Sequence, residues 1–388
     1  MPSFPTQYSG TVASFSIIAF LISVFLFTSK LYFAELSSTQ PVSVKNFYEI
    51  LSPYSVSEQC STQSYLILLS IEQVAVTFLC LLAFFIILHA TFLFNIFTLT
   101  TLSSCGMFLL LYNHPYYVRF IGFTVSNFSL TLAMFSLIGE TWKYNSFIGL
   151  FAFAAEGPAF LTSLTIIKLE NIYNISNILH IFLAVGCCLL PFIILCILRW
   201  IQSDQHYICV TGGDIPDSET IPLRDNWFYH LMIHVCVPMS ITSLLCAFSV
   251  YGLLHAIETK SSYTAMYNLT SIFYGGQYLA QIIAIGITEY LSYSFTFPFV
   301  QILILASYGM FYAYSLQSYM WLMACFSFIQ GGFFGLAIPF FYDYLFRMLP
   351  NNITRKFAIL LLLCINQIGC SMGLVLSLPC NCLLFKKI

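Results

Sequence analysis

Long apolar runs separated by short polar stretches extend over most of the chain. A helix needs roughly 20 apolar residues to cross about 30 Å of hydrocarbon, and eleven runs are close to that length. They predict spans at residues 11–34, 64–88, 91–112, 117–138, 145–168, 174–201, 229–257, 265–290, 294–314, 318–342 and 356–383. The pattern therefore predicts an all-α polytopic membrane protein with about eleven transmembrane helices.

Two polar stretches interrupt the apolar pattern, at residues 36–63 and 203–226. We predict an N-terminal six-helix bundle over residues 1–202, which includes the loop 36–63. A central polar loop over residues 203–228 and a C-terminal five-helix bundle over residues 229–388 follow. Six and five spans on either side of a central loop are typical of two related helical bundles.

The composition fits a protein whose main partner is the lipid bilayer. Of the 388 residues, 59% are hydrophobic and 7% are charged, against about 25% charged residues in soluble domains. A net charge of -2 gives no indication of a nucleic-acid partner. The first apolar run lacks a preceding positive region and is long enough to span, so we expect it to remain as a helix. We expect a multi-pass protein of the plasma membrane.

Glu156 is the foremost candidate for function, because a carboxylate near the bilayer centre costs about 2.5 kcal/mol or more and normally faces a bundle interior or a water path. Gly157 and Pro158 follow it and weaken the helix locally. Lys168 lies about 18 Å further along the helix, too far to pair with Glu156, and the sequence places no other lysine or arginine securely at that depth. Glu156 is then either a neutral hydrogen-bonding group or a proton-exchanging group that couples uptake to a proton gradient. A purely structural bond to a neighbouring helix is the alternative.

Further polar side chains lie inside predicted spans. Gln277 and Gln281 are four residues apart and share a helix face with Tyr274, which suits a neutral polar solute. The candidate substrate-binding residues are Glu72, Glu156, Gln277, Gln281, Gln330 and Asn366. Hydrogen bonds between helices are the competing interpretation for each glutamine.

Glycines in the last two predicted spans favour close helix packing. Gly331, Gly332 and Gly335 precede Pro339 in the tenth span, and Gly369 and Gly373 have the small-xxx-small spacing in the eleventh. Such residues let helix backbones approach closely.

Enzymatic interpretations have little support in the sequence. His230 and His234 have the spacing of metal ligands, but no third ligand follows at a suggestive distance. Motifs for nucleotide hydrolysis or acyl transfer are absent from the sequence. We predict neither a cofactor nor a metal.

Three segments resemble the equilibrative nucleoside transporter family. EGPAFLTSLTIIK (156–168) is similar to the family's G-Q-G-L-A-G…S-L…I-I pattern, with Glu156 at the glutamine and Gly157 at the second glycine. FSFIQGGFFG (326–335) resembles F-x-S-N-G-Y, with Gln330 and Gly331 at the Asn-Gly. The last span, residues 357–379, is similar to the family's closing helix.

The chain departs from this family at two places. The Pro-Trp-Asn of the first helix is missing, and Gln277 and Gln281 stand where the family carries an Asp and an Arg. The resemblance implies a major-facilitator-like carrier with two bundles, which moves nucleosides or nucleobases by alternating access. A major-facilitator-type amino-acid transporter and a membrane-embedded transferase are the alternatives.

Overall fold

A computed structural model of the chain describes the backbone of residues 9–39, 64–111, 115–144, 146–173, 183, 185–186, 188–198, 227–254, 263–288, 295–313, 320–349 and 353–386. Every element within these ranges is a helix. The central polar loop and most of the loop 36–63 lie outside the described residues, so the predicted boundaries between the bundles remain predictions.

The first half of the chain supplies α1 (Ser9–Thr39), α3 (Ser64–His89), α4 (Phe92–Leu111), α5 (Tyr116–Glu140), the short η3 (Thr141–Lys143), α6 (Ser146–Ala154) and α7 (Glu156–Tyr173). An apolar helix, Cys188–Leu198, follows. The second half supplies α9 (Trp227–Leu231), η4 (Met232–Cys236), α10 (Val237–Phe248), η5 (Ser249–Leu254), α12 (Tyr263–Ile287), α13 (Thr296–Ala313), α14 (Met320–Met348) and α15 (Ile353–Lys386).

The described helices account for each of the eleven predicted spans. Eight continuous stretches are long and apolar enough to cross a membrane, with α6 and α7 forming one of them and α9 to η5 another. Three shorter apolar helices, Cys188–Leu198, Ser271–Ile287 and Thr296–Met310, correspond to the sixth, eighth and ninth spans. The predicted fold class is thus confirmed.

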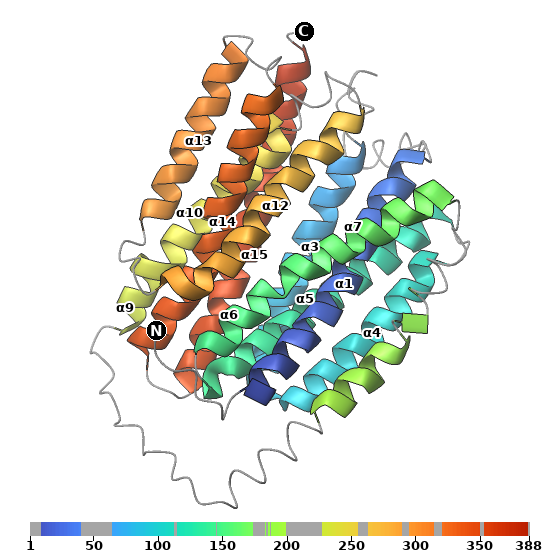
Figure 1. Cartoon of the computed structure of the whole chain (residues 1–388), viewed down its shortest axis with the longest axis vertical. Coiled ribbons are helices and arrows are strands. Elements are labelled where there is room, and N and C mark those ends of the chain that lie inside the picture. The colour runs from blue at the N-terminus through green and yellow to red at the C-terminus, as the bar shows by residue number, and fades with distance from the viewer. Residues whose placement is uncertain are drawn as a thin grey trace, which may run out of the picture.

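Helix contacts define two groups of helices. The groups meet along two lines of contact, here called seams. In the first group α1 packs on α5, α6 and α7, and α4 packs on α5; in the second, α12 packs on α14 and α10 on α15. Between the groups, α3 contacts α15, and α6 and α7 contact α12. Figure 1 shows α1 beginning at the lower end of the molecule and α15 ending at the upper end.

Glycines set the separation of the most closely packed helices. A Cβ added at Gly331 of α14 would lie 1.9 Å from the carbonyl oxygen of Phe273 on α12, and one at Gly335 would lie 2.1 Å from that of Gln277. On α15, a Cβ at Gly373 would lie 2.3 Å from the carbonyl oxygen of Leu244. The expectation of close packing is confirmed.

The helix of the fifth span is interrupted just before Gly157 and Pro158, the residues expected to weaken it. Helix α6 ends at Ala154, and α7 begins at Glu156. Pro158 has no N–H to donate to the carbonyl of residue 154, so one bond of the helical ladder cannot form. The interruption makes Glu156 the first residue of α7, where the positive end of the helix dipole favours a carboxylate.

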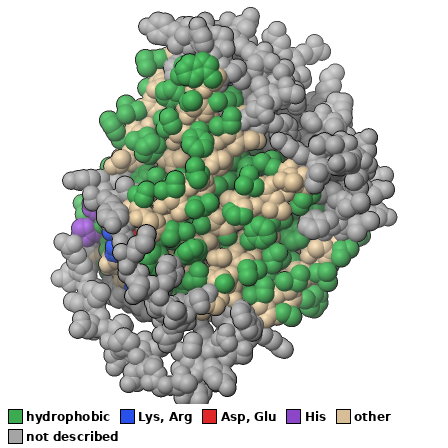
Figure 2. Space-filling model, in the orientation of Figure 1, with side chains coloured by type: hydrophobic (Ala, Val, Ile, Leu, Met, Phe, Trp, Pro, Cys, Tyr) green, Lys and Arg blue, Asp and Glu red, His purple; other side chains and the backbone are tan. Residues whose placement is uncertain are grey.

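Apolar side chains cover the outer surface. Figure 2 shows hydrophobic side chains over most of the described part of one face, with basic side chains near one edge. Phe78, Phe85 and Trp321 have 60%, 66% and 67% of their surface exposed. With the long apolar helices, this surface defines an integral multi-pass membrane protein.

Candidate substrate path between the helix bundles

Glu156 and Gln281 meet across one seam between the bundles. The side-chain Nε2 of Gln281, on α12, donates a hydrogen bond of 3.2 Å to Oε2 of Glu156 on α7. Gln281 is buried with 1% of its surface exposed. Glu156 and Gln281, two candidate substrate-binding residues far apart in the sequence, thus form a direct polar contact between the bundles.

Aromatic rings gather beside this contact. Tyr278 of α12 lies over Gly157, whose added Cβ would be 3.1 Å from the Tyr278 Cβ. Its ring centroid is 5.6 Å from that of Phe27 on α1 and 5.1 Å from that of Phe160 on α7. Tyr274 is 5.1 Å from Phe160 and also hydrogen-bonds Tyr251 of η5. We call Phe27, Phe160, Tyr274 and Tyr278 the aromatic cluster.

The other seam, between α3 and α15, is also polar. Nε2 of Gln73 donates a hydrogen bond of 2.5 Å to Oε1 of Gln367, and the hydroxyl oxygens of Thr77 and Ser371 are 2.5 Å apart. The Ser371 hydroxyl additionally donates to the Gln73 carbonyl at 3.2 Å. These four residues, here called the polar seam, hold α3 against α15 at two successive helical turns.

Glu72 lies within the first bundle and is fully buried. Its Oε1 accepts a hydrogen bond from Nδ2 of Asn127 on α5. Its other oxygen is buried without a hydrogen-bond partner among the described residues. The positive charge of Lys30 on α1 acts on the carboxyl groups of both Glu72 and Glu156. The sequence did not place this lysine securely at the depth of Glu156.

The three remaining candidates lie within the second bundle. Nε2 of Gln330 donates to Oε1 of Gln301 on α13 at 3.3 Å, and Oδ1 of Asn366 accepts from the Ser243 hydroxyl on α10 at 2.7 Å. Gln277 packs with its backbone against Gly335, and its Oε1 is buried without a partner among the described residues. Gln330 and Asn366 thus form hydrogen bonds between helices, whereas Gln277 shows no such bond among the described residues, and a substrate-binding role of all three remains a prediction.

The aromatic cluster, the polar seam and Lys30 were not among the predicted site residues. A signal for the polar seam exists in the sequence, because Gln73 and Thr77, and likewise Gln367 and Ser371, are four residues apart and therefore share a helix face. The partner of each face depends on how the two helices are rotated, which a single sequence does not specify.

Neither a protein-family model nor a curated protein matches the chain. Among solved structures, it is similar to the major facilitator superfamily proton:xylose symporter XylE bound to 6-bromo-6-deoxy-D-glucose, with a TM-score of 0.58 and 12% identity over 94% of this chain and 87% of that one. The transporter FucP in its outward conformation gives a TM-score of 0.47 and 12% identity over 96% and 98%.

The helix count, the two bundles and the likeness to XylE define the fold. The chain is an integral multi-pass membrane protein with a major facilitator fold.

Proposed function

We propose that this protein is a carrier that moves a small polar solute across the membrane by alternating access. The hydrogen bond between Glu156 and Gln281 is the observation that carries this proposal. Buried polar groups are costly in a membrane and face the bundle interior or a path. Here they join two bundles whose relative rocking would expose a central site to each side in turn.

The aromatic cluster narrows the class of solute. Aromatic faces beside a carboxylate and an amide can stack on a planar ring and hydrogen-bond its polar edge or a ribose hydroxyl. A nucleoside or nucleobase satisfies both features, and the resemblance of residues 156–168 to the nucleoside transporter pattern supports the same class. A proton-driven carrier is consistent with this picture, since XylE is described as a proton:xylose symporter and Glu156 could exchange a proton.

Two other solute classes compete with nucleosides. A sugar presents hydroxyl groups to carboxylates and amides and packs its apolar face on aromatic rings, and XylE binds a halogenated glucose. An amino acid would need groups for both of its charges, and Lys30 with Glu156 or Glu72 could supply them. A membrane-embedded transferase would instead require a reacting group, which the contacts described above do not single out.

Uptake into proteoliposomes tests the proposal. The purified protein is reconstituted and offered labelled nucleosides, nucleobases, sugars and amino acids, and the internal label is recovered and identified. We expect saturable accumulation of an unmodified nucleoside or nucleobase above that of protein-free vesicles. Uptake of a sugar or amino acid alone would contradict the substrate class, and recovery of a chemically changed product would contradict the carrier.

A further inference from the structure

A second site lies at the lower end of the molecule, away from the aromatic cluster. A pocket of ≈ 450 Å³ is formed where α3 ends and where α4 and α15 begin. Its walls come from α1, the α3–α4 connection, η3 and the end of the Cys188–Leu198 helix, with Ile353 and Lys356 of α15 closing it. We call it the interface pocket, because residues of both bundles line it.

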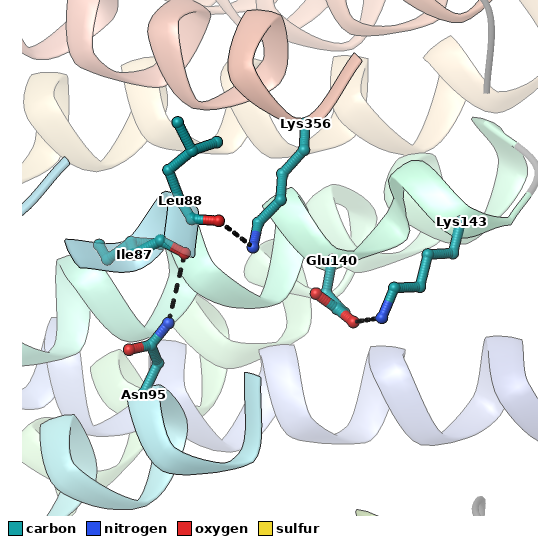
Figure 3. A network of polar contacts seen from close by, with 6 residues as sticks. All are labelled: Ile87, Leu88, Asn95, Glu140, Lys143 and Lys356. Atoms are coloured by element: carbon teal, nitrogen blue, oxygen red, sulfur yellow. Dashed lines mark hydrogen bonds and ion pairs between the residues drawn. The ribbon is translucent and has the colours of Figure 1, made fainter. Parts of the chain in front are cut away.

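Lys356 supplies a buried positive charge to this pocket. Its side chain extends from α15 toward α3, where Nζ donates a hydrogen bond of 3.1 Å to the Leu88 carbonyl (Figure 3). The residue is 7% exposed. An ammonium group carries three donors, and Leu88 is its one acceptor among the contacts of the described residues. Lys356 therefore retains donor capacity toward a ligand.

The other charged groups in the pocket leave a positive balance. Glu140 forms an ion pair with Lys143 (Figure 3), and its negative charge also acts on Lys356, so two positive charges share one carboxylate. The Nε1–H of Trp142, which also lines the pocket, is buried without a hydrogen-bond partner among the described residues. An anion with several acceptor oxygens would satisfy both the ammonium and the indole.

Two helix amino ends at the pocket favour an anion as well. Phe92 and Ile353, the first residues of α4 and α15, both line it, and the first turn of a helix presents free N–H groups and a partial positive charge. The Ile87 and Leu88 carbonyls near the end of α3 already accept hydrogen bonds, from Nδ2 of Asn95 at 3.4 Å and from Lys356 (Figure 3). Lys143 and Leu198, at the carboxyl ends of η3 and of the Cys188–Leu198 helix, also line the pocket, so the preference for an anion rests chiefly on Lys356 and the Trp142 N–H.

The surroundings of the pocket indicate where the anion comes from. Ile86, Phe94 and Ile353 beside it are 62%, 61% and 53% exposed, as expected for side chains that face acyl chains. The pocket thus lies where the apolar belt of the protein gives way to polar groups. We propose that it binds the phosphate group of an anionic phospholipid, whose acyl chains lie along these apolar side chains and whose headgroup joins the two bundles at this end.

Lipid binding by the purified full-length chain tests this inference. Native mass spectrometry measures the dissociation constant for phosphatidylglycerol, with phosphatidylcholine and inorganic phosphate as the other probes. We expect phosphatidylglycerol to bind more tightly than phosphatidylcholine. Lys356→Gln, which can still donate to Leu88, and Lys143→Gln on the exposed rim should each weaken it, Lys356→Gln by roughly tenfold or more.

Arg347→Gln is the matched control, because Arg347 pairs with Asp343 at 3.3 Å on α14 and does not line the pocket. It should bind lipid like the parent protein. Equal binding of phosphatidylglycerol by the parent and both lysine variants would overturn the site. Inorganic phosphate that displaces the lipid at comparable concentration would overturn the membrane as the source of the anion.

Discussion

At the scale of single residues, Glu156 has the clearest role in the account. As acceptor of the Gln281 hydrogen bond at 3.2 Å, it acts through an oxygen that a glutamine would also present. We therefore expect Glu156→Gln to transport at a near-normal rate without a new pH dependence. Glu156→Leu leaves the buried amide unpaired and should reduce transport by a factor of about 5 to 150.

Uptake measured over a range of external pH values, at equal protein content, checks this prediction. If the Gln variant loses a pH response that the parent shows, or loses accumulation against a gradient, Glu156 exchanges a proton during transport. In that case its neutral role is wrong and the proton-coupled mechanism replaces it.

The electrostatic interaction between Lys30 and Glu72 gives a second prediction for single residues. The positive charge of Lys30 acts on the buried Glu72 carboxyl group, so its removal leaves that carboxylate with less compensation. Lys30→Gln should lower the unfolding temperature in detergent, and adding Glu72→Gln should recover part of the loss. A double variant that loses the sum of both single effects would show that the two charges do not interact.

The contact partners of individual side chains were harder to predict than the helices in which those side chains lie. The apolar length of a span is a local property, so all eleven were found. Contacts inside the membrane depend on helix rotation and on depth relative to other helices, and thus the effect of the Lys30 charge on Glu156 was not predicted. Gln277 and Gln281 share a face by spacing, yet Gln281 reaches α7 while Gln277 lies where α12 presses on Gly335 of α14.

At the scale of helices, the α12–α14 contact depends on having no side chain at Gly331. Gly331→Ala places a methyl group 1.9 Å from the Phe273 carbonyl oxygen, so the backbones of α12 and α14 must move apart. Overpacking of this kind lowers the free energy of unfolding by about 1–3 kcal/mol. We expect a lower unfolding temperature and lower transport.

Gly309→Ala on α13 is the matched control for this contact. A Cβ there meets nothing within 4 Å, so the variant should behave like the parent protein. If Gly331→Ala proved as stable as Gly309→Ala, the two helices would be less closely packed than described.

At the scale of the whole molecule, an odd number of spans places the two ends of the chain on opposite sides of the membrane. The start of α1 and the end of α15 lie at opposite ends of the bundle (Figure 1). Epitope tags at the two termini should therefore differ in accessibility to antibody in intact cells and become equal after permeabilisation. Tags accessible on the same side would reject the eleven-span arrangement.

Relative movement of the bundles is the central claim, and the polar seam offers the most direct measurement of it. The Thr77 and Ser371 hydroxyl oxygens are 2.5 Å apart on α3 and α15, so Thr77→Cys combined with Ser371→Cys places two sulfur atoms where they can bond. Uptake of the solute identified in proteoliposomes is measured after oxidation and again after reduction. Each single-cysteine variant controls for the native thiols.

If the bundles must separate along this seam during each cycle, the engineered disulfide should abolish uptake and reduction should restore it, with the single variants unaffected. Full uptake by the double variant, in protein whose cross-link between α3 and α15 is shown by mass spectrometry to be complete, would contradict the alternating-access account.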